Sequence, residues 1–214
     1  MNMATESKRA YRSQLRNEQA AATRARILDA AGELFGTHGY AGTTLAAIAQ
    51  AAGVSAETVQ ANGPKAQLLL AAVERAAAGE EGRQGIIDRP MGREIAAEPD
   101  DDRLIERVVE LLAWSHARVW ALARAFSAAA ASDPVVREAY DGLIGRMHAD
   151  WHKTVAILDD RGMVRPGRDR EELAITLWFI CLPDTYQRLV VEAGWSEAAF
   201  KRWLGERLRR ELAG

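Results

Sequence analysis

The stretch TLAAIAQAAGVSAETVQANGPK, residues 44–65, predicts two short helices joined by a tight turn. The first helix has one apolar face, formed at helical spacing by Leu45, Ile48 and Ala49. Gly53 stands where a helix ends in the left-handed conformation that only glycine adopts at little cost. Ser55 is a suitable N-cap for a second helix over residues 56–61, which the Asn-Gly-Pro of residues 62–64 ends. Two short helices held by a glycine turn form a helix-turn-helix, an arrangement that reads DNA.

Apolar stripes at helical spacing flank this unit on both sides. The stripe before it ends at Gly39-Tyr40 and contains Ile27, Leu28, Ala31, Leu34 and Phe35, and the stripe after it contains Leu68, Leu69, Ala72 and Val73. The ordered set ILDAAGELFGTHGYAGTTLAAIAQAAGV, then S-x-x-T-V, Lys65 and a Leu-rich helix resembles the N-terminal domain of the tetracycline-repressor (TetR) family over residues 24–73. The resemblance implies an all-α fold, with an N-terminal three-helix helix-turn-helix DNA-binding domain followed by a larger helical ligand-binding and dimerisation domain.

The helix-turn-helix and the start of the next helix form the expected DNA interface. Lys65 falls in the first turn of that next helix, where free backbone N–H groups attract a phosphate and the lysine charge adds to them. Family members usually carry an aromatic residue, most often a phosphate-contacting Tyr, at the position of Gln60, and a Phe between Asn62 and Gly63. Gln60 and Asn62 can still bond base edges or phosphates. The expected DNA-binding residues are Thr44, Ser55, Ala56, Glu57, Thr58, Gln60, Asn62 and Lys65.

The charge distribution suits a nucleic-acid-binding N-terminus in a chain whose formal net charge is −2. Residues 1–65 carry seven Lys and Arg against five Asp and Glu, and the remaining residues carry the acidic excess. A basic arm at the N-terminus can follow a phosphate backbone or enter a minor groove, whereas a solvated, disordered tail is the alternative. We expect four regions: a basic, disordered arm over 1–20, the DNA-binding domain over 21–78, a linker that can hold a short helix over 79–100, and the ligand-binding and dimerisation domain over 101–214.

Four helices are expected to fill the region after the linker. They cover about residues 101–131 with a break midway, 132–162, 169–194 with a kink at Pro183, and 196–212. Aromatic side chains on these helices suit a bulky, mostly apolar ligand, while the same rings can also simply pack a core. The expected pocket residues are Trp114, Trp120, Phe126, Tyr140, Met147, Trp151 and Trp178.

The last two helices are the expected dimer interface, packed as a four-helix bundle across a two-fold axis. The apolar contacts are expected from Leu173, Leu177, Ile180, Leu189, Phe200, Trp203, Leu204 and Leu208. The resemblance then implies a homodimer that places two recognition helices in successive major grooves of a near-palindromic site.

Other kinds of site find little support in the sequence. The three aspartates of residues 100–102 suit an acidic helix start better than a metal site. His148 and His152 share a helical face but lack a third ligand, and the sequence offers no nucleophile and base pair and no phosphate loop. We therefore expect no enzyme activity, no metal and no cofactor. The single cysteine, Cys181, and the lack of an apolar run near 18 residues or a signal-peptide pattern suit a cytoplasmic protein without membrane contact.

The expected function is that of a ligand-responsive transcriptional regulator. The hypothesis is a repressor that binds double-stranded DNA as a homodimer and is released by a bulky, mostly apolar small-molecule effector. The rival hypothesis is a small-molecule-binding protein of the same architecture that has lost specific DNA binding, motivated by the changes at residues 60–63. A third, an all-α enzyme, lacks a catalytic constellation in the sequence. The residues identify neither the effector nor the operator.

Overall fold

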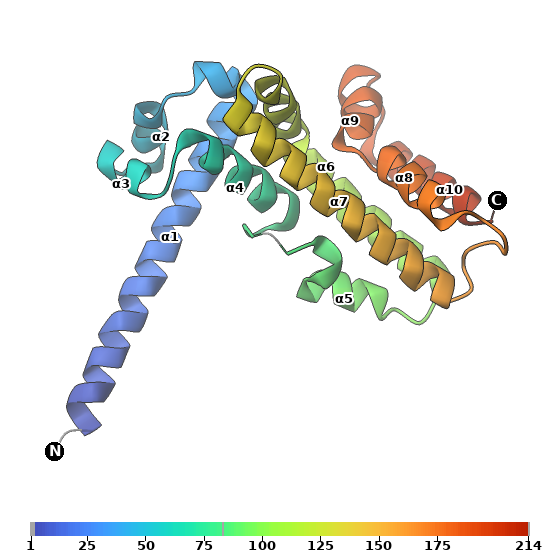
Figure 1. Ribbon diagram of the computed structural model, residues 1–214, viewed down its shortest axis with the longest axis horizontal. Coiled ribbons are helices and arrows are strands. Elements are labelled where there is room, and N and C mark those ends of the chain that lie inside the picture. Colours follow the sequence, from blue (N-terminus) through green and yellow to red (C-terminus); the bar gives the residue numbers. More distant parts are fainter. Residues whose placement is uncertain (1–2, 83, 214) are drawn as a thin grey trace.

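The computed structural model describes residues 3–82 and 84–213, with side chains from residue 14 onward, and this part is built from helices and their connections (Figure 1). The N-terminal elements are α1 (Met3–Gly42), α2 (Leu45–Ala52), α3 (Ala56–Ala61) and α4 (Lys65–Ala78). They are followed by the 3-10 helix η1 (Ile86–Asp88), α5 (Pro90–Ala96), α6 (Asp101–Ala130), α7 (Pro134–Asp160), α8 (Arg170–Ile180), α9 (Pro183–Tyr186), the π-helical turn η2 (Gln187–Glu192) and α10 (Glu197–Ala213). The predicted all-α fold is confirmed.

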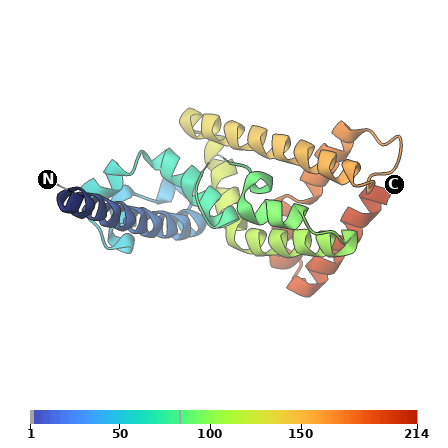
Figure 2. The ribbon, with the colours of Figure 1, turned by 90° about the horizontal axis from the view of Figure 1, so that it is seen from below.

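The helices are arranged as a small N-terminal group beside a larger C-terminal group. Figures 1 and 2 show α2 and α3 next to α1 at one end, with α4 leading from them toward the long helices α6 and α7. The chain leaves the helical path at Gly39 (φ 70°, ψ 174°), as predicted, because glycine avoids the Cβ clash of a positive φ. No helix among the described residues is long and apolar enough to cross a lipid bilayer.

The first half of α1 corrects one expectation. The sequence predicts a disordered arm over residues 1–20, but the structure has helix from Met3 onward. This segment is rich in Ala, Arg, Gln and Glu, which favour helix, and it prolongs a helix whose later turns are fixed by packing. It projects away from the rest of the molecule in Figure 1. The basic side chains of Lys8, Arg9 and Arg12 lie outside the side chains that the structure describes.

Two hydrophobic cores stabilise the described part of the chain. The first joins α1–α4 to the second half of α6 and the start of α7, and its fully buried side chains include Phe35, Ile48, Leu68 and Phe126. The second joins the first half of α6 to α7, α8, α9 and α10, and its buried side chains include Leu104, Leu173, Phe200 and Leu204. Each such side chain contributes about 1.5–3 kcal/mol when it is buried. The helix-turn-helix therefore shares its core with α6 rather than having one of its own.

Two helix boundaries differ from those expected. α6 runs without a break over its 30 residues. Pro183 does not kink a long helix but begins a new one: α8 ends at Ile180, and Leu182 adopts an extended conformation (φ −71°, ψ 145°). Proline lacks an N–H and disfavours helix in the residue before it, so the break falls at Leu182.

Aspartate side chains begin the long C-terminal helices. Asp100 accepts a hydrogen bond from the backbone N–H of Arg103 at the start of α6. Asp133 and Asp169 cap α7 and α8 in the same way. The acidic run at residues 100–102 is thus a helix start, as expected, and its second and third carboxylates pair with arginines of other elements.

Gly92 is the position where the packing of α5 leaves least room. A Cβ there would stand 2.0 Å from the carbonyl oxygen of Ile86 and 2.8 Å from the Cα of Ile87. We predict that Gly92→Ala lowers the free energy of unfolding by about 1–3 kcal/mol, as overpacking of a buried site does. Urea denaturation measures the change.

Gly145→Ala is the matched control, because a Cβ at Gly145 in α7 meets nothing within 4 Å. Alanine there should raise stability by up to about 1 kcal/mol, since glycine is a poor residue for a helix interior. Two variants of equal stability would contradict the close approach at Gly92.

Candidate functional site

The α2–α3 unit has the predicted helix-turn-helix geometry. Thr44 Oγ1 accepts a hydrogen bond from the Ala47 N–H at 3.1 Å and caps α2. Gly53 ends α2 with φ 66° and ψ 40°, the left-handed conformation expected of it. Ser55 Oγ accepts a hydrogen bond from the Thr58 N–H at 3.2 Å and caps α3. The predicted bounds of α3 are confirmed.

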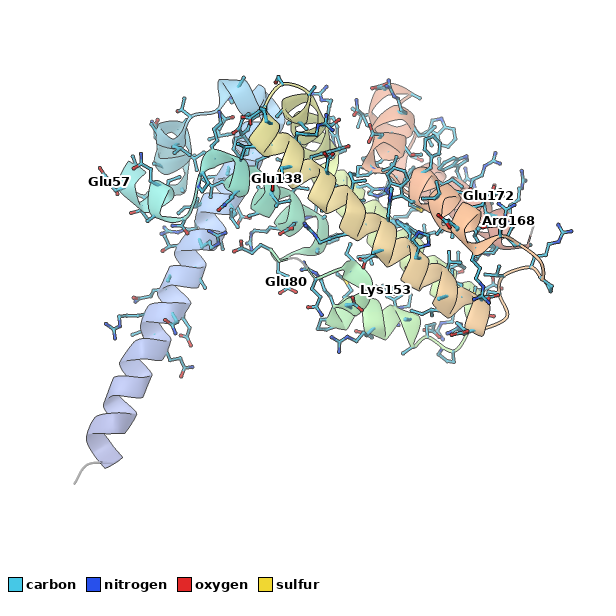
Figure 3. All side chains as sticks on the ribbon, in the orientation of Figure 1. Glu57, Glu80, Glu138, Lys153, Arg168 and Glu172 are labelled. Carbon is cyan, nitrogen blue, oxygen red and sulfur yellow. The ribbon has the colours of Figure 1, made fainter. Side chains whose placement is uncertain are left out.

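Burial separates the inner face of α2 and α3 from the outer face. The inner side chains, which pack into or against the first core, are Ile48, Ala49, Ala52, Ala56 and Val59. Ser55, Glu57 and Gln60 are exposed on α3 or at its start, and Glu57 points outward at the end of the molecule in Figure 3. Thr58 is half-buried, and its hydroxyl lies 3.1 Å from that of Ser55. The outer face of α3 is therefore free to enter a major groove.

Asn62 has a structural role instead of an outward-facing one. Its Nδ2 donates to the carbonyl of Thr58 at 2.8 Å, and Arg24 Nη1 donates to its backbone carbonyl at 2.8 Å and to its Oδ1 at 3.4 Å. These bonds fix the end of α3 against α1. We therefore remove Asn62 from the expected base contacts, because its side chain is half-buried and engaged within the protein.

Lys65 begins α4 and so lies in its first turn, as predicted, with Pro64 as the capping residue. Its ammonium group lies over the ring of Tyr40, 4.2 Å from the ring centroid. Burial lowers the pKa of Lys65, and the nearby carboxylate of Asp133 opposes that shift. Burial, and after it the nearby carboxylate of Asp133, raises the pKa of Tyr40, and the same Asp133 side chain caps α7. This cluster connects the first turn of α4 with the first turn of α7.

The outer face of α3, which is the predicted recognition face, carries little positive charge of its own. Residues 43–64 contain no Lys or Arg, and Glu57 adds a negative charge. The pKa of the Glu57 carboxyl is lowered by a hydrogen bond from its own backbone N–H and, to a smaller extent, by one from Ser55. Such a carboxylate can accept a hydrogen bond from cytosine N4. Cations that contact phosphates must come from neighbouring segments, of which Lys65 and the basic first half of α1 are the nearest in sequence.

A cavity of ≈ 320 Å³ lies between the two cores, a size that suits a small organic molecule. Its walls come from α4, Gly82, the segment 84–95, α6, α7 and the segment 181–184 that follows α8. Apolar side chains from both cores line it, among them Val73, Val108, Leu112, Val119 and Leu143.

Four of the seven predicted pocket residues line this cavity, namely Phe126, Tyr140, Met147 and Trp151. The other three do not. Trp114 is 42% exposed with Arg118 over its ring, Trp120 packs against the second core with Arg124 over its ring, and Trp178 lies edge-on to His148. The two tryptophans of α6 lie on a different side of the helix from its cavity-lining stripe, which runs through Val108, Leu112, Ser115, Val119 and Phe126.

Charged side chains form part of one wall of the cavity, and the sequence did not predict them. Arg146 Nη2 lies 2.6 Å from Glu74 Oε1, and the Gly82 N–H donates to Glu74 Oε2 at 3.0 Å. The buried Arg89 donates to the carbonyls of Glu80 and Gly82 at 3.0 Å and to that of Gln84 at 3.1 Å. Glu80 and Lys153 are labelled near this segment in Figure 3. Residues 80–82 and 84–89 are thus held in place as a wall rather than acting as a loose linker.

A second contact joins this wall to the recognition helix. Arg24 on α1 donates to both carboxylate oxygens of Glu81, at 2.5 and 2.6 Å, and also to Asn62 at the end of α3. Gly82, the next residue after Glu81, is bonded to Glu74 in the cavity wall. The end of α3 and the cavity are therefore connected through Arg24 and the segment 81–82.

His116 is the polar residue of the cavity that sequence reasoning missed most clearly. It is buried and lines the cavity beside Ser115. The available signal was its place between Leu112 and Val119, within an otherwise apolar stripe of α6.

Five of the eight predicted dimer contacts are buried inside the second core of the same chain, namely Leu173, Leu177, Phe200, Leu204 and Leu208. The prediction is wrong for these residues because a side chain in its own core cannot contact another copy. The other three, Ile180, Leu189 and Trp203, are half-buried against the same core. The exposed apolar side chains lie elsewhere on these elements: Ile175 and Phe179 on α8, Val191 on η2, and Trp195 before α10.

Comparisons with known proteins agree with this architecture. The family model of the bacterial regulatory proteins of the tetR family matches residues 27–61, which hold the end of α1, α2 and α3. A comparison with the curated proteins finds no significant sequence match.

Solved structures show the same fold over nearly the whole chain. A protein from Mesorhizobium loti described as a TetR-family transcriptional regulator is 24% identical, with a TM-score of 0.67 over 91% of this chain and 96% of that one. A TetR-family protein from Rhodococcus sp. is 14% identical, with a TM-score of 0.68 over 90% and 99%. A transcriptional regulator from Saccharomonospora viridis in complex with choline is 22% identical, with a TM-score of 0.65 over 87% and 95%.

The different environments of Asn62 and Gln60 give a testable contrast. We predict that Asn62→Ala lowers the free energy of unfolding by about 1–2 kcal/mol, because it removes the side-chain bonds at the end of α3. The exposed Gln60, changed to Ala, should alter stability by less than about 0.5 kcal/mol. Urea denaturation of the two variants checks this, and a neutral Asn62→Ala variant would restore Asn62 as a candidate DNA contact.

Proposed function

We propose that this chain, whose N-terminal domain is that of the bacterial regulatory proteins of the tetR family, is a ligand-responsive transcriptional repressor. The family consists of DNA-binding regulators rather than enzymes. The observation that carries the proposal is the helix-turn-helix itself, because α3 is capped at both ends and keeps its outer face exposed. The repressor role, the operator and the dimer are parts of the proposal.

The cavity supports the ligand-responsive part of the proposal. Its walls come from both cores, so a bound molecule would change how the two groups of helices pack against each other. A solved structure of the same fold holds choline, which supports a small-molecule site in this architecture. The effector can lower DNA affinity only to the extent that it binds the DNA-free state more tightly than the DNA-bound state. In this proposal the DNA-free state is the one with the occupied cavity.

The contacts around Arg24 provide a route between the two sites. A ligand that displaces the segment 80–89 would pull on Glu81, and Arg24 holds Glu81 and the end of α3 together. The Lys65, Tyr40 and Asp133 cluster is a second route, from the start of α7 to the start of α4. The first route ends at the C-cap of α3, and the second ends at the first residue of α4, which follows it in the chain.

Selection from a pool of random-sequence DNA duplexes tests the proposed DNA recognition. We expect the protein to enrich a near-palindromic site, because two recognition helices in a symmetric dimer read two equivalent half-sites. Binding to that site should weaken steeply as salt rises. A pool that remains random after repeated selection would favour the alternative function, a small-molecule-binding protein without specific DNA binding.

Lysine variants refine the same measurement. Lys65→Ala should weaken binding to the selected site and to random DNA alike, and should reduce the slope of log K against log salt by about one. Lys201→Ala is the matched control, since Lys201 pairs with Glu110 and Glu197 in the C-terminal group of helices. If the two variants lost the same affinity, Lys65 would not contact a phosphate.

The exposed apolar face of α8 is the proposed dimer contact, in place of the buried face predicted from the sequence. Ile175 and Phe179 are four residues apart on this face and are 40% and 66% exposed. We predict that Phe179→Glu yields a folded monomer, measured by analytical ultracentrifugation, because an unpaired charge in an apolar interface is costly.

Val135→Glu provides the control for a charge on an exposed apolar residue. Val135 is 63% exposed at the start of α7, distant in sequence from α8. The Val135→Glu variant should therefore form an assembly of the same molar mass as the wild-type protein. A dimeric Phe179→Glu variant would place the interface elsewhere.

A further inference from the structure

One imidazole ring stands among the apolar side chains of the cavity. His116 on α6 is 3% exposed, and its ring lies edge-on to Tyr186 and Phe200. The residue lines the cavity, and its Nδ1 atom is buried without a hydrogen-bond partner in the described part of the protein. Buried polar atoms are rarely left unpaired, because losing water without gaining a partner costs free energy. The Nδ1 atom therefore calls for a partner from outside the chain.

The protonation state of this ring decides what that partner must offer. Burial lowers the pKa of His116 to about 4, so the ring is neutral at physiological pH. The backbone of Cys181 opposes that shift and raises the pKa of the ring, as a carbonyl that accepts its N–H does. A neutral imidazole has one N–H donor and one acceptor nitrogen. With the N–H used on Cys181, the unpaired nitrogen is an acceptor and needs a donor.

The buried charged groups of the cavity wall already have partners, and Asp184, which also lines the cavity, is exposed. Glu74 pairs with Arg146, and the buried Arg89 is held by backbone carbonyls. Burial raises the pKa of Asp150, and the backbone of Ile86 opposes that shift. The described lining thus leaves no buried charge unpaired that would select an ionic ligand. A neutral molecule matches this lining better than an ion does.

We propose that His116 accepts a hydrogen bond from the bound effector, and that the effector is a neutral, mostly apolar molecule that carries a hydroxyl group. The apolar lining holds the body of the molecule, and the imidazole nitrogen selects its O–H. The inference rests on the proposed function, which assigns the cavity to an effector, and it adds the chemical class of that effector.

A pair of probes that differ only in the O–H tests the inference. 4-Propylphenol and 4-propylanisole have nearly the same apolar body, but only the phenol can donate a hydrogen bond. Equilibrium dialysis against the wild-type protein without DNA should show roughly tenfold tighter binding of the phenol, the usual effect of one buried hydrogen bond. Equal affinities, or failure of the phenol to bind, would overturn the proposal.

Two variants locate the preference at His116. His116→Phe removes the acceptor but keeps an aromatic ring against Tyr186 and Phe200, so it should bind both probes equally well. His116→Asn restores a side-chain acceptor near the position of Nδ1 and should restore part of the preference for the phenol. A preference that persists in His116→Phe would assign the hydroxyl to another group.

A measurement on the unchanged protein covers the case in which these variants do not fold. The ¹⁵N resonance of the His116 Nδ1 atom should shift when the phenol is added and should stay in place with the anisole. An unmoved resonance with bound phenol would overturn the proposal.

The outcome is independent of DNA binding. If the wild-type protein binds the phenol more tightly than the anisole but the phenol does not release DNA, the regulatory function fails and the ligand site stands. If the protein binds DNA and is released by compounds without an O–H, the regulatory function stands and the proposed hydrogen bond at His116 fails.

Discussion

The passage of α6 through both hydrophobic cores is the constraint on which the rest of the structure depends. Its first half packs with α10 in the second core, and its second half packs with α1 and α4 in the first core. At 1.5 Å per residue, its 30 residues extend about 45 Å. Because interiors are closely packed, a shift of one core along this helix is transmitted to the other. The cavity lies where the two cores meet, so an occupant there acts on both.

Polar contacts restrict how the two cores can move relative to each other. The apolar cores alone would permit many small relative displacements, whereas Arg24 fixes one end of α3 and Glu81 at defined distances. Arg89 then fixes the segment that carries Glu81 by bonding three of its carbonyls. Arg89 is buried and has few alternative arrangements, because an unpaired buried group costs free energy. Arg24 and Glu81 are 33% and 35% exposed, so their ion pair is a weaker constraint. The end of α3 is therefore connected to the cavity wall through a partly exposed ion pair and a buried arginine.

The sequence predicted the local elements well, because caps and turns depend on neighbouring residues. Ser55 and Gly53 specify α3 and the turn before it without help from the rest of the chain. Faces of helices in the C-terminal group were harder. Leu177 and Phe179 are both apolar on α8, yet one is buried and the other is 66% exposed. Only the packing of α6, α7 and α10 distinguishes them, and that packing is set by contacts distant in sequence. The cavity depends on the same contacts, so its polar lining could not be found from spacing alone.

The lack of Lys and Arg over residues 43–64 has a consequence for how a regulator of the proposed kind could diverge. In the proposed function, base reading falls to the outer face of α3, while the charges available for holding phosphates lie on other elements. Substitutions on α3 can then change which sequence is preferred without altering the electrostatic attraction to DNA, because phosphate contacts carry no sequence information. Such a separation lets duplicated copies of the gene acquire different targets through a few changes at exposed positions. The fold and the shared core would be unaffected.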